Sequence, residues 1–155
     1  MVDDKDILHV EGLLTFRLTA LLFKVRGGVI NDLKSYGVAE REWRVLALIA
    51  NYEPITASEL IAVRPLDKAS VSRAVASLVE RKYVVAVSHP TDGRARTLQL
   101  TKQGRELYEK LAPASIARNE RVLSVLTDDE REQLFATFDK LYAHVERLQG
   151  GAKTR

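Results

Sequence analysis

The chain of 155 residues is 46% hydrophobic and 29% charged, with a formal net charge of +3. This composition is ordinary for a globular protein and excludes a disordered or fibrous chain. The absence of cysteine excludes disulfides, thiolate zinc sites and thiol redox switches. No apolar run reaches the roughly 20 residues that cross a bilayer, and the acidic start does not resemble a signal peptide, so we expect a cytoplasmic protein. The histidines are too scattered for metal ligation, and we expect no metal or cofactor.

Apolar residues near the N-terminus recur at the spacing of a helix. They are Ile7, Val10, Leu14, Leu18, Leu21 and Val25. Phe16 and Phe23 project from nearly the opposite side. A helix that is apolar on two sides needs two partners, so we expect it to pack between its own domain and a second subunit, with Phe16 and Phe23 as dimerisation residues. Gly27 and Gly28 either break this helix or permit close packing.

Arg17 lies at the edge of the same apolar face. A buried guanidinium needs an anionic partner. It could receive the carboxylate of a small-molecule ligand, or it could pair with a protein carboxylate across a dimer. We favour the protein carboxylate.

A second helix is expected from about residue 39 to 50, with Trp43, Leu46 and Ala47 turned inward. Trp43 could wall a ligand pocket, but core packing is the favoured interpretation. Residues 56–59 read Thr-Ala-Ser-Glu, a capping box in which Thr56 and Glu59 cap each other's backbone amides. The pattern predicts a short helix over 57–63 that ends before Pro65.

Asp67 is predicted to cap a further helix over about 68–81. Val71, Ala74, Val75 and Leu78 line one side, whereas Ala69, Arg73, Ala76, Ser77 and Glu80 lie opposite, with Ser70 and Ser72 on the flanks. Small polar residues with one arginine suit close approach to base edges. The candidate DNA contacts on this helix are Lys68, Ala69, Ser70, Ser72, Arg73 and Ser77.

Residues 83–87 and 97–100 are predicted to be two strands around a turn at 90–94. Arg94 at the turn is our candidate for insertion into a minor groove, where negative potential is concentrated. We expect Arg96 to pair with Asp92 or with a phosphate. Asp92 would repel DNA, so its expected role is to hold an arginine and the turn. The helix–turn–helix followed by a basic hairpin is how a small domain reads both grooves.

The last part of the chain is predicted to be helical. Thr101 begins a helix to about residue 124, and a second capping box, Thr127 to Glu130, begins a final one. An apolar stripe on the final helix includes Phe135, Phe138 and Tyr142, which we assign to dimerisation or core packing. Residues 55–110 carry ten basic and six acidic residues, so the basic excess coincides with the helix–turn–helix.

In this order the motifs are a specific signal: Trp43, Leu60, Asp67 to Arg73, Asp92 to Arg96, and Leu100 to Gly104. The chain therefore resembles the MarR (multiple antibiotic resistance regulator) family of winged helix–turn–helix transcription factors over roughly residues 7–148. The resemblance implies a homodimer held by its terminal helices, recognition helices in successive major grooves of a pseudo-palindrome, and wing arginines in the minor grooves. Many relatives are repressors released by small aromatic or phenolic ligands.

Three positions depart from the pattern of the family. Lys82 stands where relatives often have glycine, Pro65 occupies a turn where a small residue is common, and the first wing strand lacks the arginines often found there.

We therefore expect a mainly helical α+β fold. Its parts are an N-terminal dimerisation helix (1–36), a winged helix–turn–helix (37–101, with the recognition helix at about 68–81 and the wing at about 84–100), C-terminal dimerisation helices (102–149) and a frayed tail (150–155). The predicted function is that of a homodimeric repressor of transcription that binds double-stranded DNA and a small aromatic or phenolic effector. The alternative is a winged-helix module that docks onto a protein. An enzyme is disfavoured because no nucleophile–base pair, phosphate loop or metal set is present.

Overall fold

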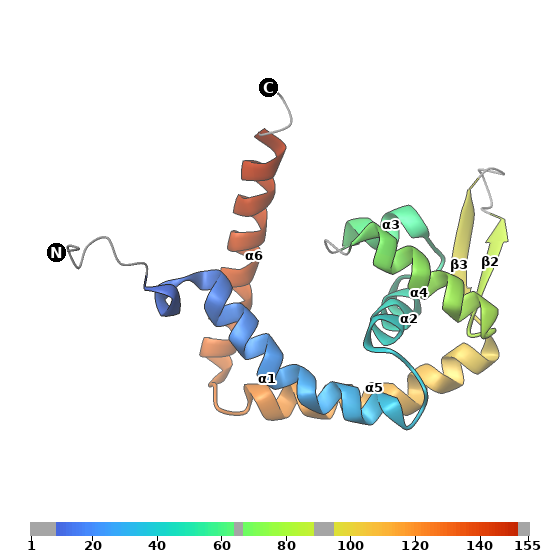
Figure 1. Cartoon of the computed structure of the whole chain (residues 1–155), viewed down its shortest axis with the longest axis horizontal. Helices are drawn as coiled ribbons and strands as arrows, with labels where there is room; N and C mark the ends of the chain where they lie inside the picture. The colour runs from blue at the N-terminus through green and yellow to red at the C-terminus, as the bar shows by residue number, and fades with distance from the viewer. Residues whose placement is uncertain (1–8, 64–66, 89–94, 152–155) are drawn as a thin grey trace. The chain divides into compact units, whose positions relative to one another are not determined.

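The computed structural model describes residues 9–63, 67–88 and 95–151. Its elements, in chain order, are a short 3-10 helix (Val10–Gly12), α1 (Leu14–Lys34), α2 (Glu40–Tyr52), β1 (Ile55–Thr56), α3 (Ala57–Val63), α4 (Lys68–Glu80), β2 (Val84–Ser88), β3 (Arg96–Leu100), α5 (Lys102–Leu123) and α6 (Asp128–Gly151) (Figure 1). The chain divides after Ile116 into two compact units. The expected fold class, mainly helical with a small antiparallel sheet, is confirmed.

The N-terminal helix differs from its prediction at its start, and of the two alternatives at Gly27 and Gly28 the structure excludes a break. Leu13 is extended (φ −75°, ψ 130°) and separates the 3-10 turn from α1, so Val10 does not share a helix with Leu14. Ile7 lies outside the described residues. At the other end α1 continues through Gly27 and Gly28 to Lys34. Each internal glycine costs a helix about 1 kcal/mol, but packing of the following turns against the core, where Leu33 is 3% exposed, outweighs that cost.

Three strands form an antiparallel sheet in the order β1-β3-β2. The predicted hairpin is confirmed, with Val84 opposite Leu100 and Ser88 opposite Arg96. β1 was not predicted, because two residues, Ile55 and Thr56, are too few to show alternation. The sheet therefore ties the start of α3 to the wing.

The core of the first unit lies between α2, α3, α4 and the sheet. Its largest fully buried side chains are Leu46, Ile49, Leu60, Leu78 and Val84. Each contributes about 2 kcal/mol by leaving water.

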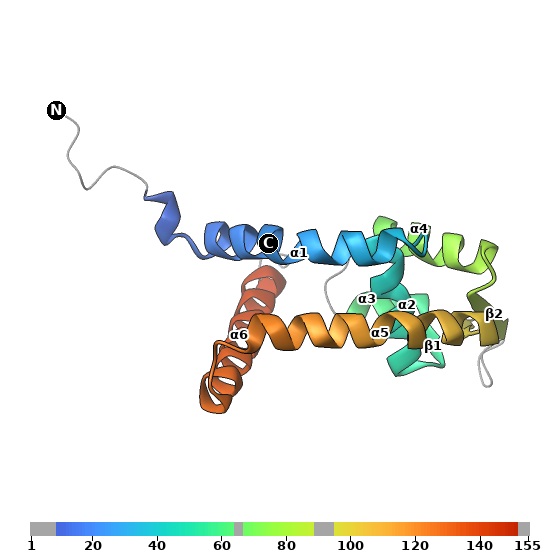
Figure 2. The same cartoon turned by 90° about the horizontal axis from the view of Figure 1, so that it is seen from below.

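The first half of α5 packs on this core through Leu107 and Leu111 (Figure 2). The Trp43 ring, 8% exposed, stacks on Tyr108 with ring centroids 5.8 Å apart. The interpretation of Trp43 as a core residue is confirmed.

The predicted helix caps are present. The Glu59 carboxylate accepts from the Thr56 amide at 2.7 Å, while the Thr56 hydroxyl accepts from the Glu59 amide at 3.2 Å. Thr127 and Glu130 repeat this exchange at the start of α6, at 2.8 and 3.3 Å. These local hydrogen bonds fix where the helices begin because the first amides of a helix lack internal partners.

Large apolar side chains remain exposed on α1 and on α6 of the single chain. Phe16 is 48% and Phe23 82% exposed on α1, and on α6 Phe135 is 50% and Tyr142 45% exposed. Phe138 is half-buried. Runs of exposed apolar side chains of this kind mark surfaces that bind a partner.

Candidate nucleic-acid interface

One side of α4 is buried and the other faces solvent. Val71, Ala74 and Leu78 face the core. Lys68, Ala69, Ser72 and Arg73, four of the predicted DNA contacts, are exposed, and Ser70 is half-buried on the flank. The exposed face carries small side chains and one long cation, so it can approach a groove closely.

Asp67 caps α4 as predicted. Its carboxylate accepts from the amide of Ser70 at 2.8 Å and from that of Ala69 at 3.4 Å. Hydrogen bonds from the side chain and then the amide of Ser70, with a smaller contribution from the charge of Arg73, hold the pKa of Asp67 below its ordinary value of 3.8. The carboxylate is thus committed to the helix and is charged at neutral pH.

Arg73 rests loosely on its own helix. One guanidinium nitrogen lies 3.4 Å from the Ser70 hydroxyl oxygen, which is a long contact. The guanidinium of Arg73 is exposed and can therefore turn to a base or a phosphate, as its predicted role requires. The hydroxyl of Ser70 is instead engaged by the Asp67 carboxylate.

Ser77 is half-buried and engaged inside the fold. Its hydroxyl donates to the Glu42 carboxylate of α2 at 2.5 Å. The same carboxylate accepts from Arg81 at 3.2 Å and from the Ala39 amide at 2.8 Å. Arg81 also donates to the Gly37 carbonyl and lies over the Tyr83 ring. This cluster, which we call the Glu42 hub, fastens the second half of the recognition helix to α2.

The Glu42 hub was missed by sequence analysis. Its one local signal is the position of Glu42, three residues after Ala39, where a glutamate often caps its own helix. The contacts with Ser77 and Arg81 span more than 30 residues of sequence, and no motif reports them.

The turn that ends α4 is held by backbone hydrogen bonds. The Tyr83 amide donates to the Leu78 carbonyl at 2.9 Å and the Lys82 amide to the Val79 carbonyl at 3.0 Å, which is the Schellman pattern. Lys82 has a φ of +60°. The departure noted at this position is therefore a lysine in the left-handed conformation that glycine usually adopts.

The wing begins where α5 touches this turn. The Thr101 hydroxyl donates to the Lys82 carbonyl at 2.6 Å and accepts from the Gly104 amide at 3.0 Å. A Cβ on Gly104 would lie 1.9 Å from the Tyr83 carbonyl oxygen. Only glycine at this position permits the close approach of α5 to the end of the recognition helix.

Of the predicted wing residues, only Arg96 lies within the described residues. Arg96 is exposed and donates to the Ala86 carbonyl of β2 at 2.9 Å. Asp92 and Arg94 lie outside the described residues, so the expected pairing of Arg96 with Asp92 stays a prediction.

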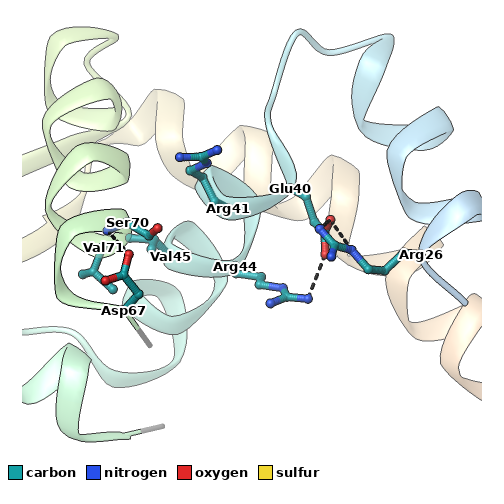
Figure 3. A pocket seen from close by; sticks show the side chains of 8 residues that line it. All are labelled: Arg26, Glu40, Arg41, Arg44, Val45, Asp67, Ser70 and Val71. Atoms are coloured by element: carbon teal, nitrogen blue, oxygen red, sulfur yellow. Dashed lines mark hydrogen bonds and ion pairs between the residues drawn. The ribbon is translucent and has the colours of Figure 1, made fainter. Parts of the chain in front are cut away.

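The two candidate ligand residues are not adjacent in sequence and have different surroundings. Arg17 is exposed, and its Nε donates to the Glu11 carbonyl at 2.8 Å rather than to a carboxylate. Trp43 is in the core. A pocket of about 390 Å³ lies instead between α1, α2 and α4, lined by Arg26, Glu40, Arg41, Arg44, Val45, Asp67, Ser70 and Val71 (Figure 3).

Two of the three arginines in this pocket pair with the same carboxylate, that of Glu40. Glu40 accepts from Arg26 at 2.6 Å and from Arg44 at 2.8 Å. Arg41 is exposed, and its guanidinium points away from Glu40 (Figure 3). Among the residues that the structure describes, no group of three His, Asp or Glu side chains could hold a metal, and no helix is long and apolar enough to cross a membrane.

Comparison with known proteins agrees with this arrangement. The sequence profile of the MarR family matches residues 36–95. An uncharacterized HTH-type transcriptional regulator of Bacillus cereus is 27% identical over 118 residues, which are 76% of this chain and 78% of that protein. A MarR/EmrR family transcriptional regulator from Acinetobacter sp. ADP1 superposes with a TM-score of 0.82 at 28% identity, over 90% of this chain and 99% of the other. CouR of Rhodococcus jostii RHA1, solved bound to p-coumaroyl-CoA, shares the fold at 24% identity and a TM-score of 0.77, over 87% and 95% of the two chains.

An exposed recognition helix, a two-stranded wing and a small apolar core define a winged helix–turn–helix regulator that binds DNA. The profile of the MarR family matches the part of the chain that holds the helix–turn–helix, and the likeness to the Acinetobacter regulator extends over nearly the whole fold. The chain is thus similar to the MarR family of transcriptional regulators in both respects.

Proposed function

We propose that this regulator is a homodimeric repressor that works in the cytoplasm, binds a pseudo-palindromic operator and is released by a small aromatic or phenolic effector. The observation that carries the proposal is the exposed face of α4, where Ala69, Ser72 and Arg73 are free to face bases while the opposite face fills the core. The proposed base and phosphate contacts are Lys68, Ala69, Ser70, Ser72 and Arg73, with Asp92, Arg94 and Arg96 in the wing.

For Ser77 the proposed role is narrower than a direct contact. Its hydroxyl hydrogen is donated in a hydrogen bond to Glu42, so toward DNA the hydroxyl oxygen can only accept a hydrogen bond, for example from an exocyclic amine. Ser77 thus acts mainly by orienting the residues that precede it.

The dimer is supported by the exposed apolar side chains of α1 and α6. Phe23, at 82% exposure, is the most exposed aromatic ring among the described large hydrophobics. A second copy that covers such rings would remove apolar surface from water at about 25 cal/mol per Å². Sedimentation of the purified protein should give the mass of two chains, and Phe23→Glu should shift the equilibrium toward one.

The effector is supported by the ligand in CouR, a coenzyme A ester of a phenolic acid. In this chain Arg17 is the proposed partner for an anionic group of the effector; Trp43, being in the core, could contribute only its exposed edge. Displacement of bound DNA by an aromatic or phenolic acid, absent in Arg17→Ala, would support this part.

The experiment that tests the whole proposal is selection of bound sequences from random duplex DNA by the purified protein. Recovery of an inverted repeat with half-sites about 10 base pairs apart is the expected result. A recovered site without dyad symmetry would overturn the homodimeric mode of binding. Raised expression from a promoter carrying the recovered site, when the protein is present, would overturn the assignment as a repressor.

A further inference from the structure

The two flanks of the recognition helix face different parts of the first unit. On one flank, Val79 and the neighbouring Lys82 line a groove with Val85, Ala86 and Arg96 of the wing. On the other flank, Ser70 lines the arginine pocket and Ser77 bonds Glu42 of α2. The helix therefore lies between the wing on one side and the first turns of α2 on the other.

Each flank carries exposed cations. The wing flank has Lys82 and Arg96, both exposed. The α2 flank has Arg41, which forms no hydrogen bond or ion pair with any other described residue and points away from Glu40 (Figure 3). Arg44 and Arg26 share the charge of Glu40, and the carboxylate of Asp67 is occupied by the amides of α4. Among the described residues that line this pocket, Arg41 is thus the arginine without a carboxylate partner.

A helix of about 10–12 Å diameter fills a major groove about 12 Å wide. Its two flanks then face the two sugar–phosphate backbones that border the groove. A cation on only one flank would neutralise only one of these backbones.

We infer that Arg41 of α2 binds a phosphate of the DNA backbone on the side of the recognition helix opposite to the wing. The guanidinium presents several N–H donors in a plane, which suits a phosphate oxygen pair. Such a contact fixes the register of α4 in the groove and adds affinity without sequence preference. With the wing cations it holds the helix from both sides.

A phosphate contact has a signature that a structural role lacks. Each neutralised phosphate adds about 0.9 to the slope of log K against log salt concentration. The slope can be measured before the operator is known, with a fluorescently labelled duplex of mixed sequence about 30 base pairs long, which spans two half-sites. Fluorescence anisotropy at several salt concentrations gives the slope.

The decisive variants are Arg41→Ala, Arg41→Lys and Lys110→Ala. Lys110 is exposed on α5, so its substitution by alanine removes the same charge from a different element. We expect Arg41→Ala to lower the slope by about 0.9 for each bound copy, and Arg41→Lys to keep it. Lys110→Ala should leave the slope at the wild-type value. Thermal unfolding should be unchanged in all three, since these side chains are exposed.

Two results would overturn the inference. If the affinity of the wild-type protein falls steeply with salt concentration but the slope for Arg41→Ala is unchanged, Arg41 does not contact a phosphate. An equal decrease of the slope for Lys110→Ala would show that the slope depends only on the net charge of the protein and not on the position of Arg41. Failure of the wild-type protein to bind any duplex would instead count against the DNA-binding function as a whole.

Discussion

The Ser77 hydroxyl of α4 donates a hydrogen bond of 2.5 Å to the Glu42 carboxylate of α2. Glu42 is 9% exposed, so this carboxylate depends on its donors in place of water. The bond joins a helix of the core to the helix that meets DNA, and Arg81 adds a second link one turn later. The angle of the recognition helix is therefore set by a polar contact as well as by apolar packing.

Removing the Ser77 hydroxyl should weaken the fold. A hydrogen bond to a buried charged group contributes about 1.5–3 kcal/mol, and Glu42 keeps two other donors, so we expect Ser77→Ala to lower the free energy of unfolding by about 1–2 kcal/mol. Urea denaturation measures this change. Ser72→Ala on the exposed face of the same helix is the control, expected within about 0.5 kcal/mol of wild type. Equal values for the two variants would remove Glu42 as an anchor of α4.

Gly104 is required by a close approach rather than by a turn. An added Cβ would meet the Tyr83 carbonyl oxygen at 1.9 Å, and a backbone atom cannot swing away as a side chain can. We expect Gly104→Ala to destabilise the protein by about 3 kcal/mol, at the upper end for overpacking. Gln103→Ala, at an exposed neighbouring position, should cost less than about 0.5 kcal/mol. A stable Gly104→Ala protein would mean that α5 can shift away from the wing.

Local features of the fold were predictable from the sequence, because short-range chemistry sets them. Thr56 with Glu59, and Asp67 before Lys68, specify helix starts through hydrogen bonds made within three residues. The hairpin and the inward side of α4 followed from periodicity. The recognition helix and the capping residue were therefore found at their observed positions.

Long-range features were not predictable, since one sequence carries no record of which distant residues meet. The Glu42 hub joins residues more than 30 positions apart, and the contact between Gly104 and Tyr83 depends on how α5 packs. That Arg41 has no carboxylate partner among the described residues is seen only once Glu40 is found to pair with both Arg26 and Arg44. The first two of these features hold the recognition helix and its end within the fold.

Lys82 holds a conformation in which a side chain is strained. Its φ of +60° costs a residue with a Cβ about 1 kcal/mol relative to glycine. We expect Lys82→Gly to raise the free energy of unfolding by about 1 kcal/mol, measured by urea denaturation. Lys82→Ala retains the Cβ and should show no such gain, which separates relief of strain from loss of charge.

Arg94 tests the role of the wing tip. If it inserts into a minor groove, Arg94→Ala should weaken binding to the selected operator by about 1–3 kcal/mol at fixed salt, the usual size of a good groove contact. Arg94→Lys keeps the charge but loses the planar guanidinium, so it should recover only part of the affinity. Anisotropy titrations with the operator measure both, and wild-type affinity in Arg94→Ala would remove the residue from the interface.

Because Asp67 caps α4, we expect the free energy of unfolding to depend on pH in the acidic range. Because the pKa of Asp67 is lower in the folded protein than its ordinary 3.8, the ionised form stabilises the fold at pH values above about 4. That stabilisation is lost as pH falls through the lowered pKa. Asn caps a helix about as well as Asp but does not titrate, so Asp67→Asn isolates this contribution.

Urea denaturation of both proteins between pH 7 and about pH 3 tests this expectation. The difference in unfolding free energy between wild type and Asp67→Asn should be constant above about pH 5 and should move against the wild type below about pH 4. Other carboxylates titrate in both proteins and cancel in the difference. A difference that stays constant over the whole range would mean that Asp67 is bound equally well when protonated, and that its charge plays no part in starting the recognition helix.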